Sequence, residues 1–130
     1  DIDNMVDNLL KNDNITNVID EEIFKELAKF KTDILDKMRK DLDKTRTDLM
    51  NCVNPTQLDS LAYKVVVKNE IFSAIENEII DISKYIDKLQ NEEYPLERLY
   101  NIFEDMIIDN KTVSEETIVD CLNIFNKEEE

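Results

Sequence analysis

The side chains that could carry chemistry in this chain are carboxylates, lysines, tyrosines and two thiols, because the sequence contains no histidine. Without histidine, Ser-His-Asp and Cys-His catalytic groups, Glu-x-x-His di-iron sites and His-ligated zinc are excluded. The sequence also lacks glycine, which phosphate-binding loops, calcium loops and nucleophile elbows need for positive φ or close backbone approach. We therefore expect no enzyme activity, no catalytic residue, no bound metal and no cofactor.

One group of carboxylates is the exception to that expectation. Asp33 with Asp36, and Glu78 with Asp81, are each three residues apart, which places each pair on one helical face. Paired carboxylates can hold Mg²⁺, as they do in all-helical nucleotide pyrophosphohydrolases. The acidic motifs of those enzymes are richer in glutamate and lie on more closely spaced segments. A solvated charged face is the simpler interpretation of these four residues.

The elements that must position these side chains are helices. Pro55 and Pro95 are the only prolines, and apolar residues recur at helical spacing along most of the 130 residues. The sequence predicts an all-α single domain over residues 1–130. The formal net charge is −15, and residues 91–130 carry twelve acids and three bases. We expect residues 127–130 to form a flexible acidic tail.

Two long segments predict an antiparallel helical hairpin, one over about 20–53 and the other over about 55–90. Asn54-Pro55 connects them, with Asn54 as the N-cap and Pro55 in the first turn. In such a hairpin, facing residues have position numbers with a constant sum, and Asp41 with Lys68 gives 109. The same sum pairs apolar residues: Ile23 with Ile86, Leu27 with Ile82, Phe30 with Ile79, Ile34 with Ile75, and Met38 with Ile71.

Shorter helices are predicted at about 2–11, 95–108 and 114–127, packed with the hairpin as a helical bundle. Ser114 is the predicted cap of the last of these. The two C-terminal helices are short and should cover only the half of the hairpin near residue 90. Cys52 then lies at the hairpin tip and Cys121 in the other half, which predicts two free thiols and favours a cytoplasmic location.

The candidate partner-binding residues are Leu42, Tyr63, Val66 and Val67. Leu42 is the only apolar residue between Arg39 and Asp48, whereas the facing stretch 61–67 is largely apolar. The first segment cannot cover all of that surface, and an uncovered apolar patch usually marks a contact. Two alternatives stay open: the helix at 2–11 folds back over this patch, or the patch binds another molecule.

The sequence thus favours a non-enzymatic protein–protein interaction module, either an adaptor or an inhibitor or immunity-type protein, using the hairpin surface. The alternative is a carrier that holds a lipid or other apolar small ligand in the bundle core. The acidic charge is compatible with a basic protein partner or with self-association, and it opposes direct nucleic-acid binding. No transmembrane segment is expected. Abundant Ile, Asn, Asp and Lys is typical of an AT-rich genome.

Overall fold

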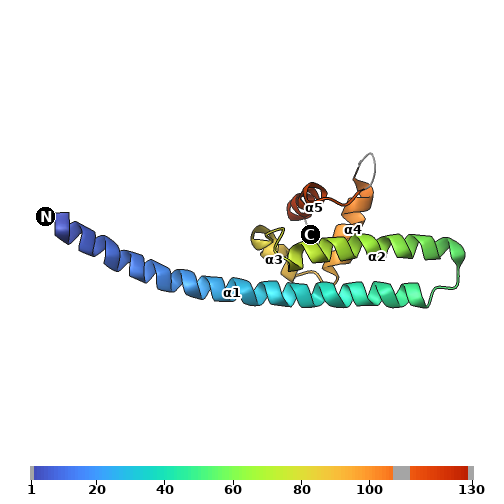
Figure 1. Cartoon of the computed structure of the whole chain (residues 1–130), viewed down its shortest axis with the longest axis horizontal. Helices are drawn as coiled ribbons and strands as arrows, with labels where there is room; N and C mark the ends of the chain where they lie inside the picture. Colours follow the sequence, from blue (N-terminus) through green and yellow to red (C-terminus); the bar gives the residue numbers. More distant parts are fainter. Residues whose placement is uncertain (1, 107–111, 129–130) are drawn as a thin grey trace.

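The computed structural model describes the backbone of residues 2–106 and 112–128, and the side chains of residues 21–106 and 112–128. The chain is all-α, as predicted (Figure 1). Its elements are α1 (Ile2–Met50), α2 (Pro55–Glu76), the 3₁₀ turn η1 (Ser83–Tyr85), α3 (Ile86–Gln90), α4 (Pro95–Asp105) and α5 (Glu115–Lys127).

Helices α1 and α2 form the antiparallel hairpin, and residues 51–54 make its turn (Figure 1). The Asn54 side chain accepts a hydrogen bond from the Thr56 amide, and Pro55 occupies the first turn of α2, as expected. Lys68 Nζ lies 2.6 Å from Asp41 Oδ1, which confirms the predicted register at this level of the hairpin. The predicted pairs Ile34 with Ile75 and Met38 with Ile71 are buried in the core, as that register requires.

The second arm of the hairpin is shorter than predicted, because α2 ends at Glu76 instead of about residue 90. Glu78 has a φ of 59°, in the left-handed region that reverses the chain direction. The Glu78 amide donates to the Ile75 carbonyl and the Ile80 amide to the Ala74 carbonyl, so these bonds close the helix end. The Asp81 carboxylate then accepts from the Ser83 amide and starts η1.

This reversal changes the apolar pairing beyond residue 76. Ile79 is 55% exposed and Ile23 is 50% exposed, so the predicted pairs of Phe30 with Ile79 and of Ile23 with Ile86 are wrong. Ile82, Ile86 and Leu89 are buried instead in the common core, on the turn and short helix that follow the reversal. Folding back packs α3 against α1 and places these residues in the same buried cluster as residues of α4 and α5.

Helix α1 is continuous from Ile2 to Met50, so the separate helix predicted at 2–11 is wrong. Asn12-Asp13-Asn14 does not end it, because Asn and Asp are only mildly unfavourable inside a helix and the first 50 residues contain neither glycine nor proline. The helix is about 74 Å long at 1.5 Å per residue. Its N-terminal end lies at the opposite end of the hairpin from the turn at 51–54, so it does not fold back over the tip (Figure 1).

Helices α3, α4 and α5 gather on one side of the hairpin (Figure 1). Pro95 opens α4, and Ser114 caps α5 through reciprocal hydrogen bonds with Thr117. The predicted end of α4 at residue 108 lies outside the described residues. A single cluster of buried apolar side chains joins all five helices, and its fully buried members include Ile34, Met38, Leu89, Leu96, Leu99, Leu122 and Phe125.

Candidate functional site

The four predicted partner-binding residues divide into two buried and two exposed side chains. Tyr63 is 37% exposed and Val66 is 54% exposed, so both remain available to a partner. Leu42 and Val67 are only 2% and 1% exposed, so their assignment to an accessible surface is wrong. Their position numbers also sum to 109, and they therefore occupy facing positions in the seam of the hairpin. The predicted register of the hairpin was therefore enough to place Leu42 and Val67 in the core.

Helix α4 reaches further toward the tip than the sequence suggested. The rings of Tyr63 and Tyr100 make an edge contact at 6.5 Å, and Lys64 Nζ lies 2.5 Å from Glu97 Oε1. Burial, together with Glu104 and Glu70, raises the pKa of Tyr63 above its usual value. The expectation that the C-terminal helices cover only the half near residue 90 is therefore wrong for α4.

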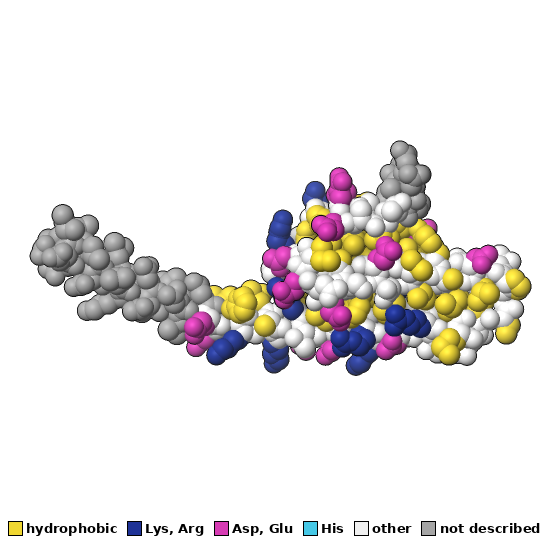
Figure 2. Space-filling model, viewed as in Figure 1, with side chains coloured by type: hydrophobic (Ala, Val, Ile, Leu, Met, Phe, Trp, Pro, Cys, Tyr) yellow, Lys and Arg dark blue, Asp and Glu magenta, His cyan; other side chains and the backbone are white. Residues whose placement is uncertain are grey.

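Beyond α4, an apolar surface remains exposed around the hairpin turn. Three of its residues were not predicted from the sequence: Met50 is 84% exposed, Val53 is 96% exposed and Leu58 is 42% exposed. Figure 2 shows hydrophobic side chains gathered at this end of the hairpin. We define the tip surface as Met50, Val53, Leu58, Tyr63 and Val66. Met50, Val53 and Leu58 lie in or near the turn between two helices and remain exposed there. Their closeness to that turn in the sequence was the signal that could have identified them.

A buried ion network positions α4 against the hairpin just below the tip surface. Lys68 is 1% exposed, and its Nζ donates to Asp41 Oδ1 at 2.6 Å and to Thr45 Oγ1 at 2.8 Å, and lies 2.6 Å from Glu97 Oε2. These three contacts use all the donors of the ammonium group. A lysine held in this way is a structural group and not a nucleophile, since its amine has no free position.

Asp41 also supplies the N-terminal cap of α4. Its Oδ2 accepts from the Glu97 amide at 2.8 Å, whereas the Tyr94 side chain makes no capping bond. Burial of Glu97, which alone would raise its pKa, is outweighed by hydrogen bonds from Lys64 and Lys68, so the Glu97 pKa lies below its usual value. The sequence predicted the Asp41–Lys68 pair, but the parts played by Thr45 and Glu97 depend on where α4 crosses.

A small polar cleft of about 170 Å³ opens beside this network. Lys44 Nζ lies 4.6 Å from the centre of the Tyr94 ring at its edge, and Asp48 also lines it. The cleft has as many carboxylates as ammonium groups, and Lys64, Lys68, Asp41 and Glu97 are already engaged with one another. The charged groups of this cleft therefore hold the helices against one another.

The structure separates the four carboxylates that could have held Mg²⁺. Asp36 pairs with Arg39 at 3.2 Å, and Asp81 pairs with Lys31 at 3.4 Å and with Ser83. Asp33 lies on the exposed side of α1, and Glu78 lies in the reversal after α2. Within the described ranges 21–106 and 112–128, acidic and cysteine side chains form no group of three or more that could bind a metal ion.

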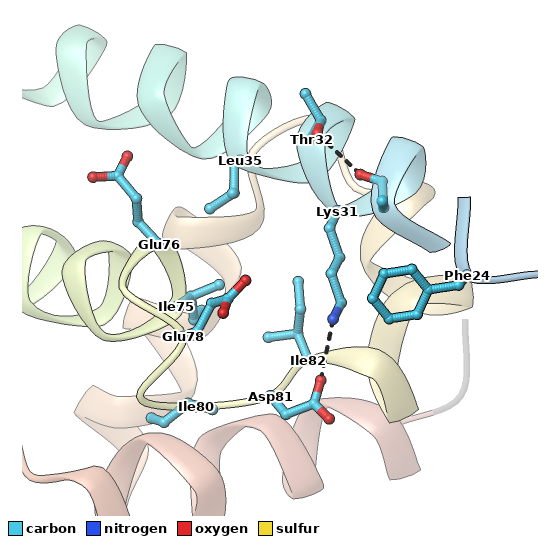
Figure 3. A pocket seen from close by; sticks show the side chains of 11 residues that line it. Phe24, Lys31, Thr32, Leu35, Ile75, Glu76, Glu78, Ile80, Asp81 and Ile82 are labelled. Carbon is cyan, nitrogen blue, oxygen red and sulfur yellow. Dashed lines mark hydrogen bonds and ion pairs between the residues drawn. The ribbon is translucent and has the colours of Figure 1, made fainter. Parts of the chain in front are cut away.

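An apolar groove of about 480 Å³ lies where α1 leaves the bundle, which we name the Phe24 groove. Figure 3 shows side chains from α1 and from the segment after α2 facing each other across it. Lys31 and Asp81 form an ion pair at its edge, and Phe24 lies beside them with 73% of its surface exposed. The apolar lining consists of Phe24, Ala28, Leu35, Ile75, Ile80 and Ile82.

Both cysteines are free thiols, as predicted. Cys121 is buried, with its Sγ 3.2 Å from Met106 Sδ, and this burial, together with Asp120, raises its pKa to about 11. Cys52 lies at the hairpin turn and is partly exposed. Among the helices of the described chain, none is long and apolar enough to span a bilayer.

Comparison of the chain with models of known protein families, with characterised proteins and with solved structures gives no match.

Proposed function

We propose that this protein is a non-enzymatic helical interaction module that binds a protein partner through the tip surface. The observation that carries this proposal is the exposure of five apolar or aromatic side chains around one turn, with Val53 96% exposed and Met50 84% exposed. A group of exposed apolar side chains of this kind often marks a contact site in a protein whose core is otherwise well filled. Tyr63 supplies an aromatic anchor of the type that often dominates binding energy.

The charges around the tip support a partner with basic residues. Residues 47–66 contain two acids, Asp48 and Asp59, and one base, Lys64, which is paired with Glu97. The whole chain has a net charge of −15, so its field attracts basic surfaces over long range. The proposed partner therefore presents an apolar patch bordered by lysine or arginine.

The tip surface is held on a rigid support. Lys68, Asp41 and Glu97 lock α4 against both hairpin helices within about two turns of Tyr63 and Val66. A rigid surface loses little conformational entropy on binding, which suits an adaptor or an inhibitor that covers a site on its partner.

Affinity capture from the native organism, followed by quantitative mass spectrometry, tests this proposal. The tip variant Val53→Asp/Val66→Asp places charges on exposed positions and should leave the helices folded. The matched control is Val119→Asp, on the exposed face of α5. We expect the tip variant to lose a partner that the wild type and the control both retain. Recovery of the same partners by all three proteins would refute the tip surface as the binding site.

The alternative function is a carrier of an apolar small ligand, which would need a cavity in the bundle core. Leu89, Leu96, Leu99 and Leu122 in that core have no exposed surface. The Phe24 groove has a volume in the range of ligand sites, but it is open and lies beside this core. Native mass spectrometry separates the two functions, because an apolar ligand retained on the purified protein would favour the carrier.

A further inference from the structure

The Phe24 groove continues the face of α1 that packs against α2. The buried residues on this face of the hairpin are Met38, Leu42 and Thr45. Alternate steps of three and four residues extend the same face from Met38 toward the N-terminus, through the groove residues Leu35, Lys31, Ala28 and Phe24. Helix α2 ends at Glu76 and leaves this extension uncovered. The groove is therefore an open length of a helix-packing face, about 17 Å long from Phe24 to Leu35.

The opposite wall of the groove is apolar and comes from the end of α2 and the reversal after it. Ile75, Ile80 and Ile82 line this wall and are buried. Across from them, the Phe24 ring is 73% exposed. Figure 3 shows the side chains of the two walls facing each other with an open space between them. An apolar side chain placed in this space would contact both walls and remove apolar area from water.

The groove is bordered by acidic side chains. Glu76, Glu78 and Asp81 line it, together with a single base, Lys31. Asp81 pairs with Lys31 at 3.4 Å and Glu76 pairs with Arg39 at 3.1 Å, whereas Glu78 forms no ion pair among the described residues. The carboxyl end of α2 adds to the negative potential, because its last turn contains no basic residue. The groove therefore presents an uncompensated negative charge beside apolar side chains.

The shape and the charge of the groove together indicate one kind of occupant. We propose that the Phe24 groove binds an amphipathic helix of a protein partner, which places apolar residues between the two walls and a lysine or arginine beside Glu78. The helical form follows from the α1 face, which already packs against α2 along the same stripe. The basic residue follows from the charge of Glu78 and from the net charge of −15, which attracts basic segments.

A helix fits this groove better than a small molecule does. Small-ligand sites usually enclose most of the surface of their ligand. Here one wall is formed by a ring that is 73% exposed, so a small ligand would stay in contact with water and leave the outer side of Phe24 uncovered. A helix of about three turns matches the 17 Å of α1 that α2 leaves open, at about 5.4 Å per turn.

The groove is a second binding surface, separated from the tip surface along the hairpin. From Ala28 to Met50, α1 rises about 33 Å, and the buried pair of Lys68 with Asp41 lies between these two levels. Binding at the groove does not require the tip surface. A chain with both surfaces would hold two partners at once, as an adaptor does.

Fluorescence anisotropy with designed helical peptides tests the groove. The probe is a labelled peptide of about 18 residues, with leucines at alternate spacings of three and four and lysines beside them. We expect it to bind the wild type, and we expect Phe24→Ala to weaken binding at least about ten-fold, because this ring is the main exposed apolar contact. Val66→Ala and Val119→Ala remove exposed apolar side chains elsewhere and are the matched controls. Both should bind the peptide within about two-fold of the wild type.

Charge reversal tests the chemistry of the occupant. A second peptide has glutamate in place of every lysine. Glu78→Lys should weaken binding of the lysine peptide about ten-fold and strengthen binding of the glutamate peptide. Asp120→Lys makes the same change of net charge on the exposed face of α5 and should alter both affinities by about two-fold or less. Circular dichroism checks that each variant keeps its helices.

Several results would overturn the proposal. One is no binding of the lysine peptide to the wild type at about 1 mM, and another is equal weakening by Phe24→Ala and Val66→Ala. Equal effects of Glu78→Lys and Asp120→Lys would assign the binding to net charge alone.

Other occupants of the groove have their own signatures, and each would also overturn the proposal. A wild-type dimer that Phe24→Ala dissociates in sedimentation equilibrium would assign the groove to a second copy of the chain. An apolar molecule retained by the wild type and lost from Phe24→Ala in native mass spectrometry would assign it to a small ligand. None of these outcomes changes binding at the tip surface, so the two proposals fail separately.

Discussion

Removing the ammonium group of Lys68 should destabilise the fold more than any surface substitution. In Lys68→Met, the carboxylate of Asp41 stays buried at 2% exposure and keeps the Glu97 amide as its donor among the described residues. Glu97 loses less, because it is partly exposed and retains Lys64 at 2.5 Å. Leaving one member of a buried ion pair unpaired costs about 3–5 kcal/mol. With an m-value of about 2 kcal/mol/M, the urea midpoint should fall by roughly 2 M.

The double variant tests the physical reason for that loss. Asp41→Asn removes the buried charge and keeps an oxygen that can cap α4, so Lys68→Met/Asp41→Asn should be more stable than Lys68→Met alone. The single variants should therefore be coupled by at least about 1.5 kcal/mol in a double-mutant cycle. Urea unfolding followed by far-UV circular dichroism measures all three, with the exposed Lys40→Met as the control, expected within about 0.5 kcal/mol of wild type. A loss below about 1 kcal/mol for Lys68→Met, or simple additivity in the cycle, would refute the reasoning.

Three further predictions concern other parts of the chain. Because the Glu97 pKa is lowered in the folded protein, its contribution to stability is present above the usual glutamate pKa of 4.5 and is lost as pH falls through the folded pKa. Glu97→Gln should therefore flatten the fall of stability at acid pH, and an unchanged fall would count against the contacts to Lys64 and Lys68. Glu78→Gly should stabilise the protein by about 0.5–1 kcal/mol in thermal unfolding, since glycine adopts the φ of 59° without steric cost; a lower melting temperature would contradict this. With a pKa of about 11, Cys121 is a thiolate in roughly one molecule in a thousand at pH 8. Iodoacetamide should therefore modify Cys52 first, as measured by peptide mass spectrometry. Equal labelling of the two cysteines would be inconsistent with a buried Cys121 thiol.

The hairpin could be predicted from sequence because two independent signals agree. Asn54-Pro55 fixes the turn, and the apolar positions of the two arms then match in a single register. That register holds where both arms are helical, and the buried Asp41–Lys68 pair lies within it. The same register places Leu42 opposite Val67. The prediction that these two residues lie on the surface did not take this into account.

The end of α2 could not be predicted from apolar spacing alone. Ile75, Ile79, Ile82 and Ile86 continue at helical intervals through the reversal, so the pattern gives no indication of the break. The reversal is stabilised by tertiary burial, which carries Ile82 and Ile86 into the common core at the cost of a left-handed Glu78. Left-handed backbone is marked in sequences by Gly and less often by Asn or Asp, so Glu78 gave no sign of it.

The candidate surfaces were also only partly predictable. Tyr63 and Val66 were identified because their surroundings in sequence are more apolar than the facing arm can cover. Met50 and Val53 were missed, although they lie in or near the turn between two helices and remain exposed there. The Phe24 groove depends on both the continuity of α1 and the reversal after α2, so neither segment alone predicts it.

The most direct test of the central claim is site-specific photo-cross-linking at the tip surface in the native organism. A photoreactive amino acid in place of Val53 should link the protein to a defined partner, identified by mass spectrometry together with the cross-linked peptide. The same amino acid in place of Val119, on the exposed face of α5, should not produce that product. Cross-links of equal yield and identity at both positions, or an absence of protein cross-links at position 53, would contradict binding through the tip surface.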